Sequence, residues 1–280
     1  RANMNNLDIA AKRAEEQGYG QLGVVCPPSL PPYTYTMDFI DMLVASGVDI
    51  LFIPFMAPQV RMPWMMGGTE QSVDVVGYRE GITSDMAFDI VEKTREKYPD
   101  KPIVIVSFFN DVLCYGVGRF AEKCREYGVD GIDTPGYSLI TNQDYVGYGA
   151  LLAAANTYLI HPISTELAMA GEGTKEYELL VDLVKAGGGF VFIMADSAGK
   201  SGATGSLPVD KLRPAVARVK ALQKQMDAVC PVITVCGVAS PKNGEEAVRE
   251  SGSDGVLMAS AVIRMIQAGE SLESIGAYLH

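Results

Sequence analysis

The chain has 280 residues, of which 48% are hydrophobic and 29 are glycines, and its formal net charge is −11. This acidic balance argues against nucleic acid as a partner, because such a surface repels a polyanion. No apolar run is long enough to cross a membrane, and the five cysteines lack the spacing of a zinc site or a disulfide framework. We therefore expect a cytoplasmic protein with reduced thiols, no metal and no cofactor.

Helical and strand patterns alternate along the whole chain. Residues 5–17 have the period of an amphipathic helix, and a glycine follows it. Beyond it, short apolar runs predict strands at residues 22–25, 49–53, 103–106, 131–133, 158–160, 190–194, 232–235 and 255–258. Between and after them, helices are predicted at residues 37–45, 85–98, 118–127, 144–155, 175–186, 210–226, 244–250, 259–268 and 272–279.

Eight strands that each precede a helical segment predict an α/β fold, a (β/α)8 TIM barrel with an extra N-terminal helix. No linker composition or charge run divides the sequence. We therefore expect a single TIM-barrel domain over residues 1–280, with the leading helix in residues 1–20 and the barrel in residues 21–280. Residues 54–83 are too many for an ordinary connection between a strand and a helix, and we expect this segment to be functional.

The last two predicted strands end on small residues. Gly237 follows strand 232–235, and Ser260 follows strand 255–258 at the start of a helical pattern. In TIM barrels the loops after strands seven and eight, with the N-terminus of a short helix, commonly bind phosphate. Ser260 is also a good helix N-cap. We interpret this end of the chain as a site for a small phosphorylated ligand.

Three predicted strands are preceded by the same short pattern. Asp49, Asp130 and Asp254 each follow a glycine two positions earlier and stand just before, or at the start of, a strand. Glycine is favoured immediately after a helix, and Asp is favoured in turns. We interpret this weak repeat as structural.

Several short pieces occur in the order that they have in one known family. They are Gly47-Val48-Asp49 with Ile53-Pro54-Phe55, Gln71 with Gly81-Ile82-Thr83, Phe109-Asn110 with Tyr115-Gly116, Gly128-Val129-Asp130-Gly131 with Pro135, Ala198-Gly199-Lys200-Ser201-Gly202-Ala203, Cys236-Gly237-Val238-Ala239-Ser240-Pro241, and Ala259-Ser260-Ala261-Val262-Ile263. Over residues 20–268 the chain resembles the α subunit of tryptophan synthase. The resemblance implies a TIM barrel that cleaves indole-3-glycerol phosphate to indole and glyceraldehyde 3-phosphate, a retro-aldol reaction.

That reaction uses a Glu at the end of the second strand and an Asp in the following loop. One group protonates the indole ring carbon, and another takes protons from the indole nitrogen and the hydroxyl. Aligned with the family pattern, the Glu position falls on Ile50 or Phe52, and the Asp position falls on Arg61 or Met66. None of these residues is acidic, so the family's chemistry would need acid and base groups at other positions.

Two residues are candidates for that role. Asp133 ends the fourth predicted strand, where the family has an apolar residue that faces the ligand, and catalytic groups of TIM barrels come from such strand ends. It could instead cap the next turn or pair with Arg61. His161 follows the fifth predicted strand and titrates near neutral pH, so it suits general acid/base catalysis, although a hydrogen-bonded wall residue is the alternative.

The resemblance also implies a set of ligand contacts. Gly202, Gly237 and Ser260 match phosphate-binding positions, and Asn110 and Lys200 are expected in the substrate pocket, although Lys200 could be a solvated loop cation.

Arg61 and Trp64 stand in the long segment 54–83, close to several methionines. Exposed Met and Trp side chains suggest a lid or a contact surface for a β-type protein partner. Packing of a long loop onto the barrel is the alternative.

Three functions stay open at this point. The first is a carbon–carbon lyase of the tryptophan synthase α type that acts on a small phosphorylated substrate, with Asp133 and His161 as relocated acid/base groups. The second is a catalytically silent barrel that binds a ligand or activates a partner. The third is a barrel whose ligand carries no phosphate.

Overall fold

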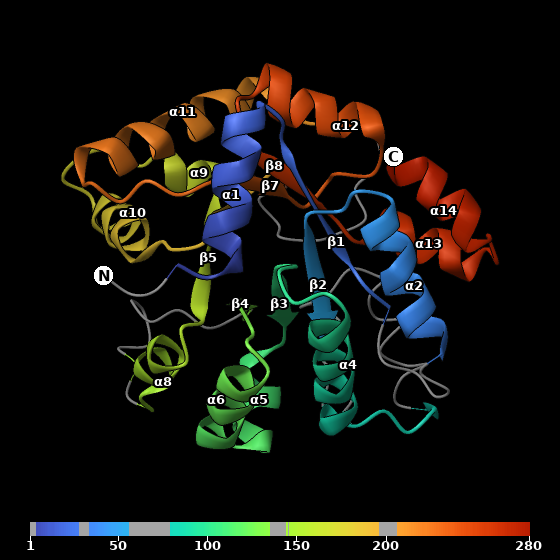
Figure 1. The fold of residues 1–280 in the computed structure, drawn as a ribbon. Coiled ribbons are helices and arrows are strands. Elements are labelled where there is room, and N and C mark those ends of the chain that lie inside the picture. The colour runs from blue at the N-terminus through green and yellow to red at the C-terminus, as the bar shows by residue number, and fades with distance from the viewer. Residues whose placement is uncertain (1–3, 28–33, 56–78, 135–143, 145, 196–205) are drawn as a thin grey trace.

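The structure, a computed structural model, describes residues 4–27, 34–55, 79–134, 144, 146–195 and 206–280. Eight parallel strands pair in sequence order, and β1 pairs with β8 to close the sheet (Figure 1). The strands are β1 Gln21–Val25, β2 Ile50–Pro54, β3 Ile103–Val106, β4 Gly131–Asp133, β5 Tyr158–Ser164, β6 Val191–Met194, β7 Val232–Val235 and β8 Gly255–Met258. The predicted (β/α)8 TIM barrel is confirmed.

Helices surround this barrel (Figure 1). They are α1 Asn6–Gln17, α2 Thr34–Ala45, α4 Ser84–Lys97, α5 Phe109–Tyr115, α6 Val117–Glu126, α8 Tyr148–Ala154, α9 Thr165–Ala168, α10 Lys175–Ala186, α11 Val209–Gln225, α12 Pro241–Glu245, α13 Ser260–Gln267 and α14 Leu272–Leu279. A π-helical turn, η2 Glu246–Glu250, continues α12. Most predicted helices are present within a few residues of their expected bounds, whereas α5 and α9 were not predicted.

Alternation along the strands divides the core into two parts. Residues such as Phe52, Val104 and Ile160 point into the barrel and form one cluster. Their neighbours, such as Leu51, Ile105 and Leu159, pack outward against the helices in a second, larger cluster. Successive side chains of a strand point to opposite faces of the sheet. Membership of one cluster or the other therefore shows whether a strand residue faces the barrel interior or the helices.

Helix α1 closes the barrel at the amino ends of its strands (Figure 1). Leu7 is 1% exposed and belongs to the cluster inside the barrel. The Asn5 side chain caps the helix by accepting from the Leu7 N–H (3.0 Å), and its Nδ2 donates to the Asp130 carbonyl (2.9 Å). The predicted leading helix is therefore a plug that is tied to the strand ends.

The repeated Asp residues join consecutive strands in pairs. The N–H of Leu22 donates to the Asp49 carboxylate (2.9 Å), and the N–H of Ile103 donates in the same way to Asp130 (2.9 Å). The Val232 N–H donates to Asp254 (2.8 Å). The backbone N–H of each Asp donates back to the carbonyl of the same strand residue, at 2.8 to 2.9 Å. We call each of these two-way connections an Asp clamp; all three lie at the amino ends of the strands.

Candidate functional site

The carboxyl ends of the strands form a ring of inward-facing, half-buried side chains. Each of these residues lies two positions after a member of the buried interior cluster on the same strand, or it pairs in register with a member on a neighbouring strand. Pro162 in the middle of β5 also meets this rule; nearer the strand ends, six residues meet it, Val25, Pro54, Val106, Asp133, Met194 and Val235. Catalytic residues of TIM barrels come from this end of the fold. We call these six residues the mouth ring.

Aromatic side chains fill the barrel beneath the mouth ring. Phe52 lies 6.1 Å from Phe190 and 6.1 Å from Phe192, measured between ring centroids, and Phe190 and Phe192 are 5.1 Å apart. A Cβ atom at Gly23 would lie 2.6 Å from the Phe52 ring, so only glycine leaves room for it. Ile50 and Phe52, the two positions at which the sequence pattern predicts the family's Glu, are both fully buried in this apolar interior. An ionised carboxylate there would lack a partner and would be costly to bury.

Asp133 is the carboxylate of the mouth ring. It ends β4 and pairs in register with Val106 on one side and Ile160 on the other, both of which belong to the interior face. Its side chain is half-buried. Next to it, Thr134 is buried and its hydroxyl lies 3.1 Å from the Tyr148 hydroxyl. The strand therefore places an acid on the interior face of the barrel, at the carboxyl ends of the strands.

His161 does not lie at the mouth of β5. The strand continues to Ser164, and His161 pairs with Val191, whose side chain packs outward against the helices. The imidazole is 1% exposed, and its Nδ1 has no hydrogen-bond partner in the described part of the chain. Burial lowers the pKa of His161 to about 4. The expected position was wrong because the strand does not end at Ile160, and the strand register gives His161 the outer face.

The predicted phosphate corner lies after β7 and β8. Cys236 and Gly237 both have positive φ angles, 62° and 115°, so the chain turns sharply there. The Gly237 conformation is one that glycine adopts readily. Ser260 is 5% exposed and is the first residue of α13, whose N-cap is Ala259. The N-cap interpretation of Ser260 is therefore wrong by one position, while the expected helix N-terminus is present.

The remaining predicted residues are less well defined by the structure. Asn110 lies in the first turn of α5, beyond the carboxyl end of β3, and is exposed. Gly202, Lys200, Arg61 and Trp64 lie outside the described residues. The structure thus brings Asp133 to the mouth and separates His161 from it.

Several buried polar residues near the mouth were not singled out from the sequence. Asp111 is completely buried in the first turn of α5. Glu246 and Asn243, 6% and 2% exposed, lie in the segment that follows β7. An acid one position after Asn110, at the start of a helix, is a sequence signal that could have indicated Asp111. In the described ranges no three His, Cys, Asp or Glu side chains are gathered as a metal site.

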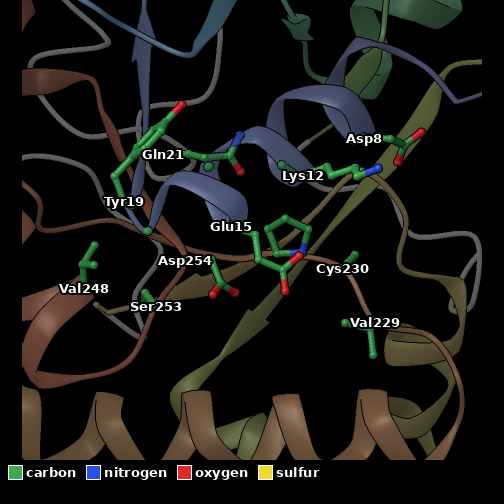
Figure 2. A pocket seen from close by; sticks show the side chains of 16 residues that line it. Asp8, Lys12, Glu15, Tyr19, Gln21, Val229, Cys230, Val248, Ser253 and Asp254 are labelled. Carbon is green, nitrogen blue, oxygen red and sulfur yellow. The ribbon is translucent and has the colours of Figure 1, made fainter.

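A cavity of about 500 Å³ lies at the opposite end of the barrel, between α1 and the segments that precede the strands (Figure 2). Asp8 and Glu15 of α1 line it, together with Cys230 and Asp254 from the barrel side. Asp254 is already bound in an Asp clamp and pairs with Lys220 at 2.6 Å. Residues at the amino ends of TIM-barrel strands serve stability rather than chemistry. The mouth ring therefore remains the candidate site.

The model of the tryptophan synthase alpha chain family matches residues 25–277. The chain belongs to this family. The tryptophan synthase alpha chain of Vibrio parahaemolyticus is 30% identical over 253 residues, which are 87% of this chain and 82% of the relative. That of Vibrio vulnificus (strain YJ016) is 28% identical over 261 residues, or 91% and 86% of the two chains.

Solved structures of the family have the same fold. Tryptophan synthase from Mycobacterium tuberculosis aligns with a TM-score of 0.80 at 23% identity, over 99% of this chain and 96% of that one. Subunit alpha from Legionella pneumophila aligns with a TM-score of 0.77 at 20% identity, again over 99% and 96%. In the part of the chain that the structure describes, no helix is long and apolar enough to span a membrane.

Proposed function

We propose that this chain is a carbon–carbon lyase of the tryptophan synthase α type that acts on a small phosphorylated substrate, with Asp133 as its acid/base group. The observation that carries the proposal is the composition of the mouth ring. Its other five members are apolar, so the carboxyl group of Asp133 is the ionisable group that this ring offers to a ligand. The family membership supports the reaction class.

One carboxyl group can move the proton that a retro-aldol cleavage requires. The protonated acid gives its proton to the ring carbon of the substrate, and the resulting carboxylate takes the proton of the hydroxyl as the carbon–carbon bond breaks and an aldehyde forms. The net result is transfer of one proton from the hydroxyl to the ring carbon. The apolar members of the mouth ring suit an aromatic group of the substrate.

The phosphate of the substrate would bind at the corner formed by Gly237 and Ser260. The N-terminus of α13 offers unpaired N–H groups and the positive end of the helix dipole. Gly202, Lys200 and Asn110 remain candidates for further contacts there, by the family resemblance. His161 has no part in the proposed chemistry, because its side chain faces the helices.

Turnover of indole-3-glycerol phosphate by an Asp133→Asn variant tests the proposal. We expect the rate of indole release to fall by about 10²–10⁴-fold, since the amide can neither donate nor accept the transferred proton. Asp85→Asn is the matched control, because this exposed carboxylate pairs with Arg119 at the surface and should leave the rate unchanged. Wild-type rates in Asp133→Asn would remove the assignment.

A second function is favoured by the packing of Phe52. An aromatic cluster stands where the family's Glu position falls, which suits a barrel that binds a phosphate ester without cleaving it, or that activates a β-type partner. This alternative predicts ligand binding with no indole release from the wild-type chain, with or without a partner. Equal affinity for phosphorylated and dephosphorylated forms of one ligand would instead favour a ligand without phosphate. Arg61 and Trp64 would be the first residues to substitute in a partner-binding assay.

A further inference from the structure

A buried network of hydrogen bonds connects the chain after β6 to the chain after β7. Glu246 lies in η2 and is 6% exposed. Its Oε2 accepts from the N–H of Leu207 (2.9 Å) and from Nδ2 of Asn243 (3.0 Å). Leu207 stands two residues before α11, so a single carboxylate oxygen holds the end of one loop against the helix that follows the next strand.

Asn243 extends the network to the phosphate corner. Its Oδ1 accepts from the N–H of Ala239 (3.1 Å) and from the hydroxyl of Ser240 (3.0 Å). Ala239 lies two residues after Gly237, and its carbonyl accepts from the Tyr278 hydroxyl (2.6 Å). Because both Oδ1 and Nδ2 of Asn243 make hydrogen bonds, the orientation of its amide is fixed. The loop after β7 is therefore held by Asn243 and by the Tyr278 hydroxyl.

The Glu246 carboxylate is kept ionised by these donors. The Leu207 N–H and the Asn243 amide lower the pKa of Glu246, and Lys242 adds a more distant positive charge. The Lys242 ammonium is 3.6 Å from the other carboxylate oxygen, Oε1, and is 72% exposed. The Ser206 side chain also hydrogen-bonds the Glu246 carboxylate and helps to lower its pKa. The solvated Lys242 ammonium lies near Oε1, while Oε2 makes the hydrogen bonds to Leu207 and Asn243.

We infer that Glu246 is a positioning residue of the phosphate corner: it acts through Asn243 to fix the loop after β7, beside which a phosphate monoester dianion would bind, and through Leu207 to fasten that loop to the chain that leads into α11. The inference rests on the proposed function, because it assumes that an anion binds beside Gly237. Fixed loops do not need to be ordered when the anion binds, so the N–H groups around Gly237 meet it with a smaller entropic cost.

Titration with inorganic phosphate, followed by calorimetry, tests this role. Glu246→Ala removes both hydrogen bonds, and we expect the dissociation constant to rise by about tenfold. Glu246→Gln can place its amide oxygen where Oε2 lies and its NH₂ group toward the solvent-exposed side of Lys242, so it should restore wild-type affinity. Glu246→Asp keeps the charge but is too short to reach both donors, and it should behave like Glu246→Ala. It also provides the test if Glu246→Ala does not fold.

Two controls separate geometry from charge. Glu245→Ala removes a neighbouring exposed carboxylate that pairs with Arg249 (2.6 Å), and it should bind phosphate like the wild type. Hydrogen exchange at the Leu207 amide should accelerate in Glu246→Ala and Glu246→Asp but not in Glu246→Gln. If the charge of Glu246 repelled the anion instead, Glu246→Gln would bind phosphate more tightly than the wild type, which would overturn the inference.

The remaining outcomes are also decisive. Unchanged phosphate affinity in both Glu246→Ala and Glu246→Asp, in a wild-type background that binds phosphate, overturns the role of Glu246 and leaves the proposed function in place. A wild-type chain that binds no phosphate overturns the phosphate corner itself, and the role of Glu246 with it.

Discussion

Asp133 and His161 lie on neighbouring strands but on opposite sides of the barrel wall. Asp133 pairs with Ile160, so His161, one position further along β5, must point to the other face. The carboxylate therefore faces the interior at the mouth, while the imidazole is sealed between β5 and the surrounding helices. A difference of one position in strand register thus decides which of two polar residues can meet a ligand.

The buried imidazole should make the stability of the protein depend on pH. Burial lowers the pKa of His161 to about 4, whereas the unfolded chain binds this proton near pH 6.5. The unfolded state therefore binds more protons between these values, and the free energy of unfolding should fall as the pH drops from about 6.5 toward 4. The loss attributable to His161 is on the order of 3 kcal/mol.

Urea unfolding of His161→Leu at pH 7 and pH 4.5 measures this contribution. The variant should lose less stability than the wild type over that interval, because it has no imidazole to protonate. His280, the other histidine, is exposed at the end of the chain, so His280→Gln should keep the wild-type pH dependence. The same pH dependence in His161→Leu as in the wild type would contradict the expected effect.

At the scale of elements, the Asp clamps hold pairs of strands together. They connect β1 with β2, β3 with β4 and β7 with β8, at the point where each second strand begins. Their environments differ. The Asp130 carboxylate pairs with Arg95 at 2.8 Å, and both side chains are largely buried. The Asp49 carboxylate accepts from the Tyr19 hydroxyl (3.0 Å), and its nearest cation in the described residues is the more exposed Arg13 at 3.7 Å.

The clamps should differ in their contribution to stability. Asp130→Ala leaves Arg95 without its carboxylate and removes the acceptor of the Ile103 N–H, so we expect a loss of about 3–5 kcal/mol. Asp49→Ala removes the acceptor of the Leu22 N–H and of the part-exposed Tyr19 hydroxyl, for which about 1–3 kcal/mol is expected. Asp85→Ala, at an exposed pair, should cost less than about 1 kcal/mol. Denaturant unfolding of the three variants measures this order, and equal losses would refute it.

The sequence patterns were sufficient to predict the barrel, because each strand is a short apolar run between helical segments. Four strands have the predicted bounds, those of β3, β4, β7 and β8. Strand β5 was predicted too short because His161 and Pro162 interrupt its apolar run. Helix α9, with four residues, is too short to show a helical period.

The residues of the candidate site were harder to predict from the sequence than the fold. Position alone was enough to suggest Asp133, since it ends a strand, and its catalytic role stays a prediction. The face of His161 depends on how β5 pairs with its neighbours, which no local pattern contains. The hydrogen bond between Leu207 and Glu246 joins residues 39 positions apart, so it is visible only once the loops are placed in space.

At the scale of the whole molecule, the two ends of the barrel differ in composition. The amino ends carry the Asp clamps and are closed by α1, whose Leu7 reaches the interior cluster. The carboxyl ends carry the mouth ring, where the side chains are half-buried. Closure of the amino end by α1 covers the interior aromatic cluster from that side.

Leu7→Ala tests how much this plug contributes. Removal of a fully buried side chain leaves a cavity above Tyr158 and its neighbours, and we expect a loss of about 2–5 kcal/mol in the free energy of unfolding. Ile9→Ala on the same helix is the control, because Ile9 is 52% exposed and its truncation should cost less than about 0.5 kcal/mol. A Leu7→Ala variant as stable as Ile9→Ala would show that α1 is dispensable for the core.

The position of the Asp clamps has a consequence for how this scaffold can change. Since the Asp clamps lie at the opposite end of the strands from the mouth ring, replacements at Val25, Val106 or Met194 leave all three clamps untouched. A library randomised at those three sites would retain mostly folded members. New specificities could therefore be selected from it without first repairing the scaffold.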